Sequence, residues 1–170
     1  PCPVNARGVL QCDAEVKSSY KKGVSLHFDV NSREESYAAR MLTKSLQERG
    51  YVINANSGDY SIKFFIDKRG YDAEAFAIIP EGNVIKIIGG DYRGLIYGAL
   101  SLSEDLRNEI LLDNAVARSE KPKLMLRAVK YDLPWDTYRH SEALNLHDET
   151  CRDPKYWEAF LDMMAENRLN

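Results

Sequence analysis

Residues 83–106, NVIKIIGGDYRGLIYGALSLSEDL, constrain the fold more than any other stretch of the chain. They begin with a β-branched apolar run over 84–88, which predicts a buried strand. Gly89 and Gly90 interrupt this run, and Asp91 is suited to cap the N-terminus of a following helix. The stretch therefore predicts a strand, a tight turn and a helix.

The predicted helix carries both an apolar stripe and a bare face. Its apolar residues at helical spacing are Leu95, Ala99, Leu102 and Leu106. Gly94 and Gly98 stand one turn apart, and each costs a helix roughly 1 kcal/mol relative to alanine. We expect close contact between the helix backbone and the sheet to compensate for this cost.

The sequence GGDYRG also invites comparison with a glycine-rich phosphate loop. Its spacing is not G-x-G-x-x-G, and it lacks the G-K-[ST] ending of a P-loop. Asp91 within the loop would also repel a pyrophosphate. The glycines are therefore interpreted as packing residues, and the sequence predicts no nucleotide or other cofactor.

The residues before this stretch predict further strands and a second helix. Alternation over 24–30 predicts a strand with one buried face and with His27 on its polar side. Ser32 and Glu35 have capping-box spacing, and the helix that they open ends at Gly50. More strands are predicted at 51–55, 60–66, 75–79 and 84–88, with the last two joined as a hairpin. The order predicts an α/β two-layer sandwich, a mixed sheet of about five strands with two helices on one face.

The pattern of predicted elements changes after this domain. Residues 108–122 resemble a connector, and the segment KLMLRAVKYDL that follows predicts a strand. After a loop over 134–152, Asp153 and Pro154 open a helix. One strand and one helix cannot bury their own faces, so we expect them to begin a larger, truncated α/β domain. The predicted organisation is an N-terminal segment 1–22, an accessory domain 23–118, and a linker with the start of a second domain, 119–170.

Composition excludes several classes of protein. The net charge is −3 without a basic stripe, so no nucleic-acid partner is predicted. No apolar run approaches the roughly 18 residues that a membrane span requires. The cysteines Cys2, Cys12 and Cys151 are odd in number, and the sequence leaves their disulfide state open. Oligomeric state is likewise open.

Residues 87–106, IIGGDYRGLIYGALSLSEDL, followed by KPKLMLRAVKYDLPW, resemble the N-terminal region of glycoside hydrolases of family 20 (β-hexosaminidases) and family 67 (α-glucuronidases). The resemblance covers about residues 23–170, and its most specific part is the helix with Arg93-Gly94 and Tyr97-Gly98. In both families a small α/β domain precedes a catalytic (β/α)8 barrel. Leu126-Arg127 matches the start of the first barrel strand, and YWEAFLDMMAENRLN resembles the first barrel helix. The sequence departs from family 67 at KYDLPWDTYR, where that family has a W-D-N element.

The resemblance implies substrate-binding rather than catalytic residues in this chain. Arg127 matches an arginine that hydrogen-bonds sugar hydroxyls, or alternatively bridges the linker to the barrel. Trp135 and Tyr138 are candidates to stack on a sugar ring, with loop packing as the alternative. Asp132 and Asp136 do not establish a catalytic carboxylate pair. No catalytic residue is therefore predicted, because the resemblance places the acids beyond this chain.

No metal site is predicted either. Polar residues gather in the loop as His140, His147, Asp148, Glu149 and Cys151. Their order fits no standard zinc spacing, so they are interpreted as a solvated loop.

The function expected from these observations is that of a non-catalytic N-terminal domain of a glycoside hydrolase, inactive by itself. By resemblance, the protein would be periplasmic or secreted and would meet its carbohydrate through the missing barrel. The alternative is a free-standing α/β module that binds a carbohydrate or a protein through its aromatic loop.

Overall fold

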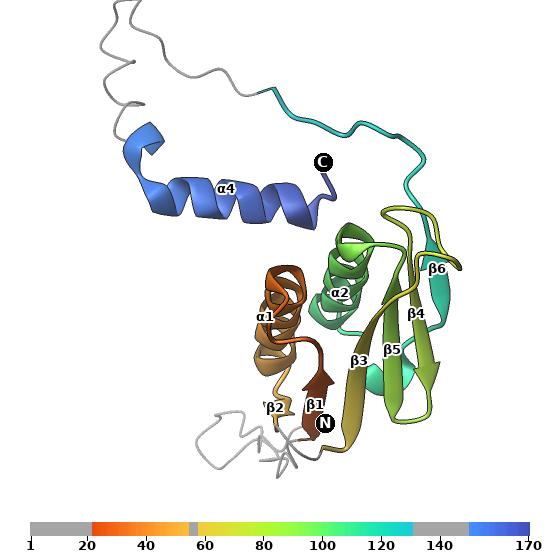
Figure 1. Ribbon diagram of the computed structural model, residues 1–170. Helices are drawn as coiled ribbons and strands as arrows, with labels where there is room; N and C mark the ends of the chain where they lie inside the picture. The colour runs from red at the N-terminus through yellow and green to blue at the C-terminus, as the bar shows by residue number, and fades with distance from the viewer. Residues whose placement is uncertain (1–21, 55–57, 131–149) are drawn as a thin grey trace, which may run out of the picture.

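The computed structural model describes residues 22–54, 58–130 and 150–170. The predicted two-layer sandwich is confirmed, with a six-stranded mixed sheet covered on one face by helices α1 and α2 (Figure 1). In chain order the elements are β1 (Gly23–His27), α1 (Arg33–Glu48), β2 (Val52–Ile53), β3 (Tyr60–Ile66), β4 (Phe76–Glu81), β5 (Val84–Gly89), α2 (Tyr92–Arg107), the 3-10 turn η1 (Leu112–Asn114), β6 (Arg118–Glu120) and α4 (Pro154–Glu166).

The strands lie in the order β2-β1-β3-β5-β4-β6. The first four of these are parallel to one another, and β4 is antiparallel to both of its neighbours. The hairpin between β4 and β5 turns at Gly82, whose φ of +58° suits glycine. This hairpin makes the sheet mixed, as predicted.

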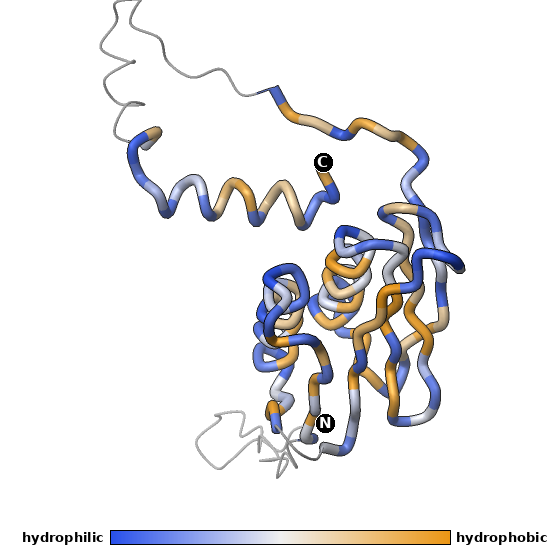
Figure 2. Tube along the Cα trace, in the orientation of Figure 1, coloured by the Kyte–Doolittle hydropathy of each residue, from blue (hydrophilic) through white to orange (hydrophobic). Residues whose placement is uncertain are grey.

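The core lies between the sheet and the two helices. Alternate strand residues point into it, with Ile62, Ile85 and Ile87 fully buried and Val24 beside them on β1. Figure 2 shows apolar residues along the strands and along the helix sides that meet them. The stripe predicted on α2 is buried throughout, so its interpretation as the core face is confirmed.

The two helical glycines do face the sheet. A Cβ atom on Gly94 would overlap the carbonyl group of Ala75, and one on Gly98 would lie 2.7 Å from Cγ2 of Ile87. Asp91 caps α2 as predicted, because its side chain accepts a hydrogen bond from the Gly94 amide. The glycines therefore serve packing.

Helix α1 begins as predicted but uses its glutamate differently. The Ser32 hydroxyl accepts a hydrogen bond from the Glu35 amide at 3.2 Å. The Glu35 carboxylate accepts one from the Asp29 amide at 2.7 Å, so it ties down the loop before the helix. The helix is followed by Gly50 in the left-handed region, with φ +87°.

Helix α2 ends in the same way, but with Glu109 at φ +69° where α1 has glycine. We expect Glu109→Gly to raise the free energy of unfolding by about 0.5–1 kcal/mol, because glycine adopts this conformation without strain. The ion pair lost, from Arg49 to the exposed Glu109, contributes little. Urea denaturation measures the effect. Glu109→Ala removes the same pair but keeps the strain, and a gain of equal size there would contradict this explanation.

Three sequence predictions need correction. The strand at 24–30 ends at His27, and Val30 is exposed. Of the strand predicted at 51–55, the described residues 51–54 form only Val52–Ile53. The segment 108–122 is not merely a connector, because β6 pairs with β4 at the sheet edge and supplies the sixth strand.

The strand predicted in KLMLRAVKYDL is also absent from its described part, 123–130. The rest of that segment lies outside the described residues. A strand requires a partner for its backbone N–H and C=O groups, and no described strand lies beside this segment. The helix predicted after Asp153 and Pro154 is confirmed as α4.

Candidate functional site

Helix α4 returns from the far end of the chain to the helix layer of the α/β domain (Figure 1). Asp153 caps its N-terminus by accepting a hydrogen bond from the Lys155 amide. The Tyr37 hydroxyl of α1 donates to the Asp162 carboxylate at 2.9 Å, and Arg107 of α2 pairs with Glu166 at 3.1 Å. These contacts are polar, and none of the α4 residues is buried.

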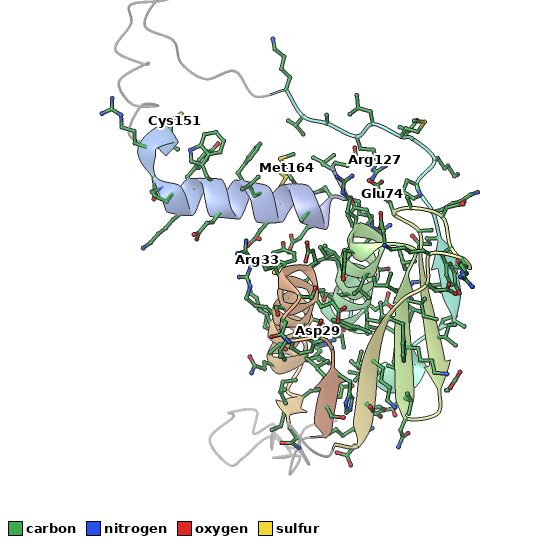
Figure 3. The ribbon with its side chains drawn as sticks, viewed as in Figure 1. Asp29, Arg33, Glu74, Arg127, Cys151 and Met164 are labelled. Carbon is green, nitrogen blue, oxygen red and sulfur yellow. The ribbon has the colours of Figure 1, made fainter. Side chains whose placement is uncertain are left out.

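The carboxylate of Glu74 receives hydrogen bonds from widely separated parts of the chain. Arg127 Nη2 donates at 2.5 Å, Arg93 Nη1 at 3.0 Å and Asn170 Nδ2 at 3.0 Å. Figure 3 shows Glu74 and Arg127 beside the C-terminal end of α4. The Glu74 side chain is only 12% exposed, and its backbone lies in the left-handed region at φ +60°.

These donors determine the charge of Glu74. Burial alone would raise the pKa of the carboxyl group, but the hydrogen bonds from Arg127, Asn170 and Arg93 outweigh it and lower the pKa to about 2. Glu74 is therefore ionised at every physiological pH.

Arg127, in the segment after β6, connects this segment to Glu74 and to the residues that follow α4. Its Nε donates to the Arg168 carbonyl at 2.6 Å, and its Nη1 donates to the Leu124 carbonyl at 2.5 Å. The guanidinium also lies over the Tyr97 ring, 5.9 Å from the centroid. Its hydrogen bond to Glu74 raises the pKa of Arg127 further above its ordinary value.

Arg168 completes the arrangement at the end of α4. It pairs with Glu120 of β6 at 3.0 Å and with Glu104 of α2 at 3.5 Å, and its guanidinium lies 5.4 Å from the centroid of the Phe76 ring. We call the set Glu74, Arg93, Glu120, Arg127, Arg168 and Asn170 the junction. A hollow of about 230 Å³ lies against it, with Phe76, Tyr97 and Pro122 among its lining residues.

The chemistry of the junction is that of a structural connection. A carboxylate held ionised by three donors is a poor general acid and a poor base at neutral pH. Among the described residues, no three metal-ligating side chains come together. The same part of the chain contains no helix long and apolar enough to span a membrane.

A second polar cluster lies away from the junction, where β1 begins. The Tyr60 hydroxyl donates to Asp113 and accepts from Lys22 at 3.0 Å, while Lys22 and Asp113 pair at 2.6 Å. Burial, followed by the hydrogen bond to Asp113, raises the pKa of Tyr60, and the bond from Lys22 lowers that of Asp113. This cluster links the start of β1 to η1.

Of the predicted substrate residues, only Arg127 lies in the described part of the chain. Its hydrogen bonds go to Glu74 and to the carbonyl groups of Leu124 and Arg168, and both its contact with a sugar and its bridging of the linker to a barrel stay predictions. Trp135 and Tyr138 lie outside the described residues, as do Asp132, Asp136 and the polar loop residues before Thr150. Cys151 is described, and its carbonyl accepts a hydrogen bond from Trp157 Nε1 at 2.7 Å.

Glu74, Glu120, Arg168 and Asn170 were not predicted as site residues from the sequence. None of them belongs to a recognisable motif, and Glu74 lies 53 positions from Arg127 in the sequence. The one sequence signal nearby was Arg93, which belongs to the helix motif that carries the resemblance.

Comparison with solved structures shows that the fold of this chain also occurs in part of a larger protein. The chain is similar to a solved chain described as a "GH138 enzyme targeting pectin rhamnogalacturonan II", with a TM-score of 0.67 and 23% sequence identity over 87% of this chain. This chain spans 23% of that one. A second solved chain, described as "Structure of CpGH84D", matches 57% of this chain and 19% of its own at 16% identity, but its TM-score of 0.40 is too low to carry an argument. No protein-family model and no curated protein matches the sequence.

Proposed function

We propose that this chain is the N-terminal, non-catalytic part of a glycoside hydrolase, and that its α/β domain supports a (β/α)8 barrel beginning after residue 119. The observation that carries the proposal is the unburied apolar surface of the C-terminal region. Met125 is 96% exposed, Leu126 74% and Leu161 60%. A helix and a segment this apolar normally lie inside a larger core.

The composition of α4 supports this reading. Its apolar side chains include Trp157, Phe160, Leu161, Met163 and Met164. Leu161 and Met163 remain exposed although polar contacts already attach the helix to α1 and α2. In a (β/α)8 barrel each helix covers the strands, and neighbouring strands pair with the first one. Such neighbours would bury the exposed apolar side chains of α4 and would provide strand partners for the segment 123–130.

The similarity to a glycoside hydrolase chain supports the choice of activity. Within the proposal, a carbohydrate is the substrate, and Trp135 and Tyr138, which precede α4 in the sequence, contact it. Arg127 remains a candidate as well, since each of its nitrogens donates one hydrogen bond within the chain and a guanidinium has five N–H donors. A periplasmic or secreted location belongs to the same proposal.

Activity measurements on two proteins test it: this chain, and the longer product of the same reading frame. The panel contains aryl glucuronides, aryl N-acetylhexosaminides and oligosaccharides from rhamnogalacturonan II. We expect the longer protein to hydrolyse at least one substrate and this chain to hydrolyse none. A reading frame that stops after residue 170, with glycan binding by the chain alone, would favour the free-standing binding module.

Hydrogen exchange on the same two proteins gives a structural prediction. Amides of α4 are expected to exchange at least about tenfold more slowly in the longer protein, because burial suppresses local opening. Amides of α1, whose buried face is already complete in this chain, serve as the internal control. Equal exchange of α4 in both proteins would show that nothing further packs on this helix.

A further inference from the structure

The sheet face opposite α1 and α2 is the second large surface that the described elements leave uncovered (Figure 1). We call it the open face. By strand register it carries one row of His27, Lys63, Lys86 and Ile79 and another of Phe65, Ile88, Ala77 and Ser119. Ala77 of the second row is buried. The alternate residues of the same strands form the core on the other side.

The first row places basic side chains on three adjacent strands. His27 of β1 is the register partner of Lys63 of β3, which in turn is the partner of Lys86 of β5. Adjacent strands are about 4.8 Å apart, so the two lysines are direct neighbours. Like charges in this position repel each other and weaken the sheet.

A neighbouring acid balances only one of the two lysines of this row. Lys86 pairs with Glu81 of β4 at 2.7 Å. Lys63 has no ion pair with any residue that the structure describes, and the His27 ring contacts the Ser25 hydroxyl at 3.2 Å. Among the described residues, Lys63 is therefore the cation of this row without an acidic partner, although the whole chain has a net charge of −3.

The second row adds apolar contact area and leads to a hollow. Phe65 is 44% exposed in the middle of the sheet, beside the half-buried Ile88. At the other end of the row, Ser119 lines an open hollow of about 490 Å³, whose rim includes the exposed side chains of Lys68 and Arg69. The lining of this hollow also contains Asp72 and Glu120, so its charges are mixed, and the lysine row is the more basic end of the face.

We propose that the open face binds an anionic carbohydrate, a polysaccharide whose sugars carry carboxylates. Lys63 and Lys86 would pair with successive carboxylates, and Phe65 would lie against the apolar face of a sugar ring. The choice of a carbohydrate over another polyanion rests on the proposed function, while the charge preference rests on the row itself. A single aromatic residue is less than the series of stacking rings that single-stranded nucleic acid uses.

Binding of this chain to polygalacturonate oligomers, measured by calorimetry at low ionic strength, tests the proposal. The same oligomers with methyl-esterified carboxyl groups are the matched ligand control. We expect at least about tenfold weaker binding of the esterified oligomers, and weaker binding of the charged oligomers as salt is added. Equal binding of both oligomers, no binding of either, or equally tight binding of single-stranded DNA would overturn the proposal.

Variants separate binding from folding. Lys63→Thr is expected to weaken polygalacturonate binding about tenfold without lowering the melting temperature, because it removes a repulsion and threonine suits a strand. Lys44→Gln, an exposed lysine of α1, is the matched charge control and should bind like the parent chain. Phe65→Thr should weaken binding, whereas Tyr92→Ser, at a similarly exposed aromatic residue, should not.

The binding and hydrolysis measurements can fail independently, so they test the role of the open face and the proposed function separately. Failure to bind polygalacturonate, together with hydrolysis by the longer protein, would overturn the role of the open face alone. The opposite result is binding that depends on Lys63, without hydrolysis of any substrate by the longer protein. It would support the binding role of the open face and contradict the proposed glycoside hydrolase activity.

Discussion

Replacing Glu74 with glutamine is expected to lower the free energy of unfolding by about 2–3 kcal/mol. The carboxylate accepts hydrogen bonds from Arg127, Arg93 and Asn170, and the Arg127 side chain is only 16% exposed. The substitution leaves this guanidinium without its counter-charge, which costs more than the loss of a surface ion pair. Urea denaturation at pH 7, followed by circular dichroism, measures the change.

Backbone strain at Glu74 provides a control. Its φ of +60° suits glycine, so Glu74→Gly loses the same contacts but relieves the strain. We expect Glu74→Gly to be about 1 kcal/mol more stable than Glu74→Ala. In a double-mutant cycle with Arg127→Gln, the two sites should also couple strongly. Independent effects would show that the short contact between the two side chains contributes no stability.

The dependence on pH follows from the lowered pKa of Glu74. A carboxyl group whose pKa is depressed by folding stabilises the folded state above its unfolded value of 4.5. This contribution is lost as the pH falls from about 4.5 to about 2, where the folded group takes up its proton. The difference in stability between the parent chain and Glu74→Gln should therefore shrink over this range. A constant difference down to pH 2 would contradict the assignment.

Gly94→Ala is expected to destabilise the protein by about 2–3 kcal/mol, the second large effect. The new methyl group would overlap the Ala75 carbonyl, which is backbone and cannot rotate away. The gain in helix propensity, about 1 kcal/mol, offsets only part of the strain. Thermal and urea denaturation of the variant measure the net change.

Gly98→Ala is the matched comparison on the same helix. Its closest neighbours are side-chain atoms of Ile87 and Phe76, which can shift by small rotations. We expect a loss of about 1 kcal/mol, clearly smaller than at Gly94. If both variants were as stable as the parent chain, close packing of α2 on the sheet would not explain the two glycines.

Much of the fold could be predicted because its signals are local. The caps at Ser32, Asp91 and Asp153 are each defined within a few residues, as is the hairpin turn at Gly82. The missed strand β6 has only the residues Arg118–Glu120, too short for a periodic pattern, and it exists because β4 offers a free edge. The strand predicted near Arg127 failed for the opposite reason, since its own residues favour a strand but no described strand lies beside it.

The sequence by itself determined the helices, most of the strands and the close approach of Gly94 to the sheet, because each depends on neighbouring residues and on the period of a helix or strand. The tertiary structure alone decided which distant side chains meet. Glu74 meets Arg127 where the segment after β6 passes the residues before β4, and His27, Lys63 and Lys86 form a row only through the register of three strands. No local pattern encodes either contact, because long-range pairing depends on the whole sheet and its covering helices.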